Sequence, residues 1–282
     1  MDDHDAGRLP AALDHQHPVD DRRRLSRTPM VAFSDAQLQA WLAAFLLPFF
    51  RILALFTAAP VLSLRSIPAR LRVGLSIVLA ATIAPSVTVP MQVDLVSMSG
   101  LGFVAQEVAV GLAIGFAARL VFAAFDLAGE VIGLQMGLSF AGFFDPQGGT
   151  GTAVGSFMNA TATLVFLALN GPLLLIAATL RSFATLPVGE VAFGFAKRFD
   201  PVALGAEVFA LGLLIALPFL ALILFVNLIL GVMSRVAPQL SLFSIGFPIT
   251  IGAGLVLLVV GLPWIERPLA DGMGKLFLMF GA

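Results

Sequence analysis

Four carboxylates lie inside long apolar stretches of the sequence and are the side chains best placed to do chemistry: Glu107, Asp126, Glu130 and Glu207. Carboxylates at membrane depth often carry protons, so a proton-coupled transporter of small solutes is one hypothesis. Histidine, cysteine and tyrosine are absent after residue 30, and no phosphate loop, nucleotide fingerprint or metal-ligand spacing occurs. We therefore expect neither an enzyme nor a cofactor or metal site.

The composition is that of a protein that crosses a membrane several times. Hydrophobic residues make up 59% of the chain and charged residues 12%, with a mean hydropathy of +0.99, whereas soluble domains are about 25% charged. The net charge is −1 and the pI is about 6.3, which argues against nucleic acid as a partner. Charged residues gather in residues 1–33, and we predict a disordered polar extension there.

The apolar residues fall into six segments, each long enough for a membrane helix. We predict these segments at residues 36–59, 73–89, 101–140, 154–183, 203–233 and 240–264, with a linker at 186–202 and a tail at 266–282 that forms a short interfacial helix. Prolines and glycines inside many of them predict bent helices, as at Asn170-Gly171-Pro172 and at Gly246-Phe247-Pro248. Three arginines without an acid predict that residues 63–72 face the cytoplasm. The fold class is an all-α membrane protein.

Charged residues inside the helices need partners. We expect Arg51 in the first segment to pair with a carboxylate from another helix. In the third segment, Arg119, Asp126 and Glu130 recur at spacings of seven and four, which places them on one helical stripe. This stripe either faces water or a charged partner, or its members pair with one another.

The third segment is the longest, and as one helix it would extend about 60 Å, twice the ~30 Å core of a bilayer. Gly129 and Gly133 have the spacing that lets membrane helices pack closely. We expect this glycine seam to lie opposite the polar stripe, so that the helix packs tightly on one side only.

Residues 133–152 combine glycines, an Asp-Pro pair and large apolar side chains in one loop. A regular helix cannot continue through this composition. Loops in water are usually polar, so apolar side chains on flexible backbone indicate a loop that is buried in protein or closes a pore. Composition alone favours the packing loop over the pore closure.

Several short motifs follow one another along the chain in a specific order and spacing. They are Gln37-Leu38-x-x-Trp41-Leu42, Pro48-Phe49-x-Arg51-Ile52, Ile67-Pro68-x-Arg70-x-Arg72, Gly133-Leu134-Gln135-Met136-Gly137 with Phe144-Asp145-Pro146, Leu169-Asn170-Gly171, and Arg235-x-Ala237-Pro238-Gln239-x-x-x-Phe243-x-x-Gly246-Phe247-Pro248. Together they resemble the FliR family of flagellar type III export-gate proteins, which has SctT-type relatives in injectisomes. The resemblance covers residues 34–265. Pro172 stands where the family commonly has histidine.

The resemblance implies an architecture and a set of partners. Residues 34–185 would be similar to FliP and residues 203–265 would be a helical hairpin similar to FliQ. One copy would join FliP-like and FliQ-like subunits in the bacterial inner membrane at the flagellar basal body, next to a FlhB-like protein. Unfolded flagellar proteins would pass through this assembly. The same role in a virulence injectisome is the alternative within this class.

The resemblance also implies a plug at residues 133–157. Its apolar gasket would consist of Met136, Phe140, Phe143 and Phe144. The loop backbone would depend on Gly137, Gly142, Asp145, Pro146, Gly148, Gly149 and Gly151. The hairpin turn would depend on Arg235, Pro238, Gln239, Gly246 and Pro248.

Overall fold

The computed structural model describes residues 35–87, 95, 97–138, 151–188, 200–236 and 245–279, and every regular element in these ranges is a helix. The helices are α1 (Asp35–Ala58), α2 (Ala69–Ile83), η2 (Ala84–Ser86), α3 (Met98–Gln135), α5 (Ala153–Ala168), α6 (Gly171–Thr185), α7 (Pro201–Val236), α8 (Phe247–Gly261), η5 (Leu262–Trp264) and α9 (Glu266–Met279). Five helices are long and apolar enough to cross a membrane, and six spans result if α5 and α6 count as one. The predicted fold class is confirmed.

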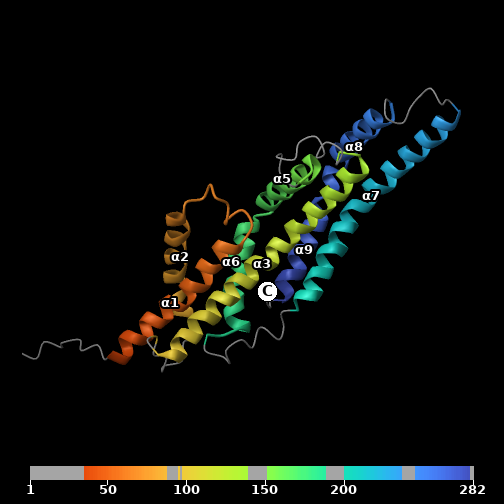
Figure 1. Ribbon diagram of the computed structural model, residues 1–282. Coiled ribbons are helices and arrows are strands. Elements are labelled where there is room, and N and C mark those ends of the chain that lie inside the picture. The colour runs from red at the N-terminus through yellow and green to blue at the C-terminus, as the bar shows by residue number, and fades with distance from the viewer. Residues whose placement is uncertain are drawn as a thin grey trace, which may run out of the picture.

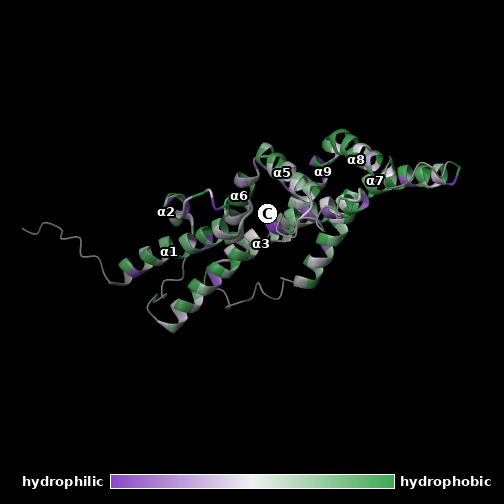
Figure 2. Ribbon diagram, turned by 45° about the horizontal axis from the view of Figure 1, so that its top comes forward, coloured by the Kyte–Doolittle hydropathy of each residue, from purple (hydrophilic) through white to green (hydrophobic). Residues whose placement is uncertain are grey.

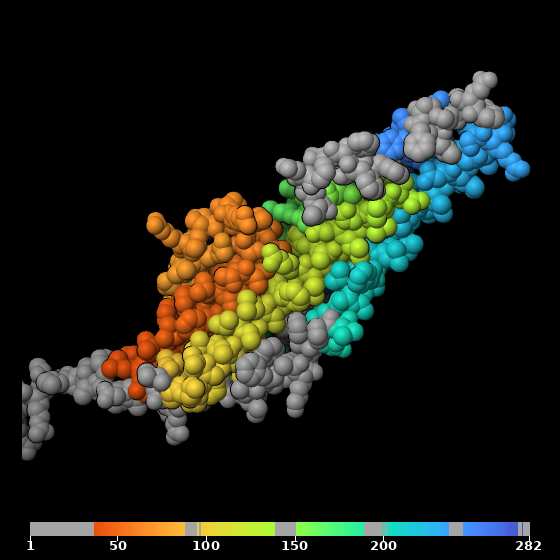
Figure 3. Space-filling model, in the orientation of Figure 1, coloured from red at the N-terminus to blue at the C-terminus, as the bar shows by residue number. Residues whose placement is uncertain are grey.

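The helices form an elongated, staggered bundle (Figures 1 and 3). α1, α3 and α7 run in one direction, and α2, the α5–α6 pair and the α8–α9 pair run back (Figure 1). α7 and α8 pack together as a hairpin. α3 is the central helix, because it packs against α1, α5 and α7. Its 38 residues extend about 57 Å at about 1.5 Å per residue.

Small residues let these helices approach α3 closely. Gly111 and Gly115 of α3 lie against α1, where a Cβ on Gly115 would come within 2.7 Å of the Cβ of Ala58. Gly212 of α7 lies against α3 in the same way, with a built Cβ 2.9 Å from the carbonyl oxygen of Ala124. Glycines therefore allow α1 and α7 each to pack closely on α3, as expected for small residues between membrane helices.

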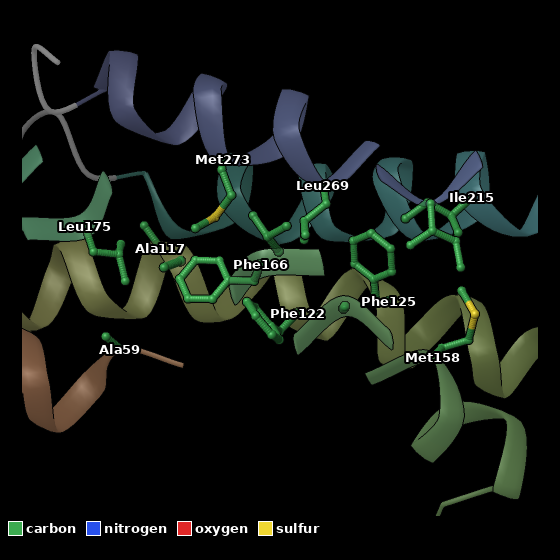
Figure 4. Close-up of a cluster of buried hydrophobic side chains, with 14 of the residues drawn as sticks. Ala59, Ala117, Phe122, Phe125, Met158, Phe166, Leu175, Ile215, Leu269 and Met273 are labelled. Carbon is green, nitrogen blue, oxygen red and sulfur yellow. The ribbon is translucent and has the colours of Figure 1, made fainter. Parts of the chain in front are cut away.

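Aromatic side chains fill the core around the middle of α3 (Figure 4). The rings of Phe122 and Phe166 meet edge to face, with their centroids 5.4 Å apart, a favourable geometry for an aromatic pair. Leu269 and Met273 of α9 are buried in the same core. The C-terminal segment is a helix as predicted, and it packs against α3, α5 and α7.

Most residues along the helices are hydrophobic (Figure 2), and many large apolar side chains are exposed on their outer faces. On α7 only 28% of the most apolar 18-residue window is buried within the chain. Its large exposed side chains include Phe209, Leu213, Leu217, Leu224, Phe225 and Leu228. Such a surface requires lipid or partner helices around it.

The predicted helix breaks are partly confirmed. α5 and α6 meet at an angle of 66°, with Asn170 between them at a left-handed φ of 56°. The ring of Phe166 occupies the space that a side chain on Gly171 would need. At the other site Gly246 caps α8 and Pro248 lies in its first turn, where proline is tolerated. The bend predicted there stays a prediction, because residues 240–244 lie outside the described residues.

Candidate functional site

The predicted loop lies between the end of α3 and the start of α5. The structure describes the chain up to Leu138 and again from Gly151. Eight predicted loop residues fall outside the described residues: Phe140, Gly142, Phe143, Phe144, Asp145, Pro146, Gly148 and Gly149. Pro238 and Gln239 of the hairpin turn also fall outside them, and Arg235 is exposed in the last turn of α7. The candidate site is therefore built from the base of the loop.

α3 ends in a Schellman motif. The backbone N–H of Leu138 donates to the carbonyl of Gly133, and that of Gly137 donates to the carbonyl of Leu134, both at 3.0 Å. Gly137 has the left-handed φ of 81° that this motif requires. The chain therefore leaves α3 in a defined direction. Glycine at position 137 allows this direction, because it adopts the left-handed conformation without strain.

The end of α3 packs against the first half of α8. Met136 is fully buried, and a Cβ built on Gly254 would lie 2.6 Å from its sulfur. A Cβ built on Gly137 would lie 2.8 Å from Cε2 of Phe247. Close contacts with two residues of α8 thus fix the point where the loop begins.

α5 begins at a threonine cap. The side chain of Thr152 accepts a hydrogen bond from the backbone N–H of Gly155 at 3.0 Å, the usual role of an N-cap residue. The backbone N–H of Thr152 donates to Oε1 of Glu130 at 2.7 Å. Gly133 packs on the Thr152 side chain, with a built Cβ 2.8 Å from Oγ1. The two ends of the loop therefore touch each other.

Polar groups and glycines share one face of α3. Asp126 accepts a hydrogen bond from Nδ2 of Asn159 in α5 at 2.6 Å, and Gly129 packs on Gly155 of the same helix. The prediction that the polar stripe lies opposite the glycine seam was therefore wrong. At about 100° per residue, positions 126, 129, 130 and 133 fall within one narrow arc, so all four face α5.

The pairing predicted within this stripe does not occur among the described residues. Asp126 and Glu130 both bind groups of α5, and Arg119 is exposed. The other alternative, a stripe that faces water or a charged partner, stays a prediction, because Asp126 and Glu130 are only partly buried and Arg119 is exposed. The shared role of the two acids in this chain is to hold α5 on α3.

A second polar cluster lies at the other end of α3, where Arg51 and Glu107 are buried together. Arg51 Nε donates to Glu107 Oε2 at 2.7 Å and its Nη2 donates to Oε1 at 2.9 Å. Its Nη1 donates to Oγ of Ser182 and its Nη2 to the carbonyl of Leu186, both at 3.0 Å. The Phe183 ring centroid is 3.9 Å from its Cζ. The predicted pairing of Arg51 is confirmed, and it joins α1, α3 and the end of α6.

These geometries leave the carboxylates of α3 little freedom for proton transfer. Glu107 is 1% exposed and ion-paired, and the other two accept hydrogen bonds from α5. Glu207 of α7 is exposed and lies 3.5 Å from Nζ of Lys275. Among the described residues no three potential metal ligands come together. The arrangement positions helices and fixes the base of a loop.

Comparison with known proteins supplies the family. A profile of the family described as bacterial export proteins, family 1, matches residues 42–276. The chain belongs to this family. It is 40% identical over 244 residues to the flagellar biosynthetic protein FliR of Pectobacterium carotovorum subsp. carotovorum, across 86% of this chain and 92% of that protein.

Further FliR proteins are also similar to this chain. FliR of Escherichia coli K12 is 40% identical over 237 residues, which cover 84% of this chain and 90% of that protein. FliR of Caulobacter vibrioides is 31% identical over 253 residues, which cover 89% and 100%. The family resemblance predicted from the motifs is thus confirmed. Arg51, Glu107, Glu130 and Thr152 all lie inside the region that the family profile matches.

Sequence reasoning missed the contact between Glu130 and Thr152. A capping box has Ser or Thr at the N-cap and Glu or Gln three residues later, and here Thr152 is followed by Gly155 in that position. The glycine at position 155 was the one available signal, because it shows that the N–H of Thr152 needs an acceptor from elsewhere in the chain. A backbone N–H is the donor, so no pattern of side chains could identify the partner.

Proposed function

We propose that this chain is a structural and gating component of the flagellar type III protein-export channel. Its family membership supports a role in the flagellar export apparatus. We propose further that one copy per channel helps to form the pore for unfolded flagellar proteins and closes it with residues 133–157. This role is structural and requires no catalysis by the chain.

The observation that carries the gating proposal is the fixed base of the loop. Gly133 and Thr152 are in contact across the loop, and Met136 is buried against α8 at the same place. Apolar side chains on a loop whose ends are anchored can fill a pore and withdraw from it without unfolding the helices. We propose that Phe140, Phe143 and Phe144 form the gasket and that Met136 seals its base.

The apolar outer faces support an assembly with other membrane helices. We propose FliP-like and FliQ-like subunits as the main partners and a FlhB-like protein at the entrance, in the bacterial inner membrane at the flagellar basal body. The large exposed apolar side chains of α7 and α8 provide surface for such partners and for lipid. The α7–α8 hairpin is the part expected to be similar to FliQ.

Two alternatives remain from the sequence. The same role in an injectisome is disfavoured because the relatives named above are flagellar proteins. A proton-coupled transporter is disfavoured because Glu107, Asp126 and Glu130 are each held by a partner within the chain. Co-purification with FliP-like and FliQ-like proteins is expected, and a homo-oligomer that transports a solute alone would contradict the proposal.

Deletion of residues 142–151 tests the gating function. We expect assembly to remain largely intact and the membrane to leak ions, measured as conductance across cells or reconstituted bilayers. A matched variant keeps the loop length and replaces Phe140, Phe143 and Phe144 by serine. It should leak as the deletion does if the gasket is apolar. Unchanged conductance in both variants would show that the loop only packs between helices.

A further inference from the structure

The start of α5 has half of a capping box. Thr152 occupies the N-cap and binds the N–H of Gly155, which stands at the position where a capping box has Glu or Gln. Gly155 has no side chain to reach back to the N–H of Thr152. Without another acceptor, one backbone donor at the start of this helix would lack its partner.

Glu130 of α3 supplies the missing half. Its Oε1 accepts the hydrogen bond from the N–H of Thr152 at 2.7 Å. A Cβ on Gly155 would overlap this same oxygen atom. The carboxylate therefore occupies the space that the glycine leaves, and it also places a negative charge at the positive end of the α5 dipole.

The contact between Glu130 and Thr152 lies where α3 ends and α5 begins, so it affects the position of both ends of the loop. Glu130 lies five residues before Gln135, the last residue of α3, and Thr152 is the cap from which α5 starts. One charge-assisted hydrogen bond thus joins the last turns of one helix to the first turn of the next. Asp126 and Asn159 make a comparable contact one turn farther from this base.

We propose that Glu130 is a positioning residue that completes the cap of α5 from a neighbouring helix and so holds the two helix ends at a fixed separation. This inference rests on the proposed function only for its effect on the channel. The separation between the end of α3 and the start of α5 is defined by residues that the structure describes, so it can be tested without reference to the channel. Loss of the contact should raise the population with separated helix ends about tenfold, which corresponds to about 1.4 kcal/mol.

The absence of native cysteines allows a direct measurement. Spin labels at Leu134→Cys and Phe157→Cys sit on exposed positions of α3 and α5, and the distance between them is measured in native membranes on the full-length chain. We expect E130A to broaden this distance distribution. E130Q should restore it, because the amide oxygen accepts the same hydrogen bond. E207A is the matched control, because it removes an exposed carboxylate of α7, and it should leave the distribution unchanged.

G155A provides an independent test with Glu130 still present, since the added methyl group displaces the carboxylate. It should broaden the distribution as E130A does. Narrow, unchanged distances in both variants would overturn the inference. Membrane conductance of the loop deletion separates the two proposals: broadened distances in E130A and G155A, with unchanged conductance in the loop deletion, support the cap and contradict the plug. Leakage in the loop deletion with unchanged distances in E130A and G155A supports the plug and contradicts the cap.

Discussion

Arg51 and Glu107 form a doubly hydrogen-bonded ion pair in the interior, with the arginine 0% and the glutamate 1% exposed. Two further N–H groups of Arg51 donate to Oγ of Ser182 and to the carbonyl of Leu186. Since the charges are paired and four of the five N–H groups of the guanidinium donate hydrogen bonds, the cluster can remain ionised in an apolar core. It joins α1, α3 and the end of α6 at one point.

Removal of either partner should destabilise the chain strongly. We expect R51M and E107L each to lower the free energy of unfolding by about 3–5 kcal/mol, because each leaves the other partner buried without its counter-charge. The double variant R51M/E107L should be more stable than R51M alone. Thermal unfolding in detergent and the amount of chain retained in membranes measure this. Additive losses in the double variant would contradict the pairing.

An exposed ion pair provides the control for this prediction. Lys275 and Glu207 are 69% and 58% exposed and 3.5 Å apart. Pairs of this kind contribute about 0–1 kcal/mol because water screens both charges. K275A should therefore unfold close to the wild-type temperature. A loss as large as that of R51M would indicate that charge removal in general, and not burial, controls stability.

The effect of replacing a glycine of α3 by alanine should depend on what that glycine faces. A Cβ on Gly115 would lie 2.7 Å from the Cβ of Ala58, whereas Gly102 has nothing within 4 Å. G115A should therefore push α1 away and destabilise the bundle by about 1–3 kcal/mol. G102A should be neutral or stabilise the helix by about 0.5–1 kcal/mol. Thermal unfolding of the two variants side by side measures this, and equal effects would contradict close α1–α3 packing.

The sequence predicted the helices well because long apolar runs and their glycine and proline breaks are local signals. It also predicted that Arg51 is paired, since a lone buried charge is too costly. It could not identify Glu107 as the partner among four candidate carboxylates, because that choice depends on how α1 and α3 pack. The misplacement of the polar stripe was different: the spacing already placed Asp126, Gly129 and Gly133 on one face.

The C-terminal helix should be essential to the core. Leu269 is fully buried and Met273 is 4% exposed, although α9 lies outside the six predicted spans. L269A should lower the free energy of unfolding by about 2–5 kcal/mol, the usual cost of a large cavity. L278A is the control, because Leu278 is 74% exposed. Equal unfolding temperatures for the two variants would show that α9 is not part of the folded core.

Gly137 is constrained in two independent ways, which substitutions can separate. Its left-handed φ of 81° disfavours any residue with a Cβ by about 1–2 kcal/mol, and the Phe247 ring occupies the space beside it. G137A should therefore destabilise the end of α3, measured by hydrogen exchange of the Gly137 and Leu138 amides. In an F247A background the cost of G137A should fall to the conformational part alone. An unchanged cost in that background would show that Phe247 does not hold the base of the loop.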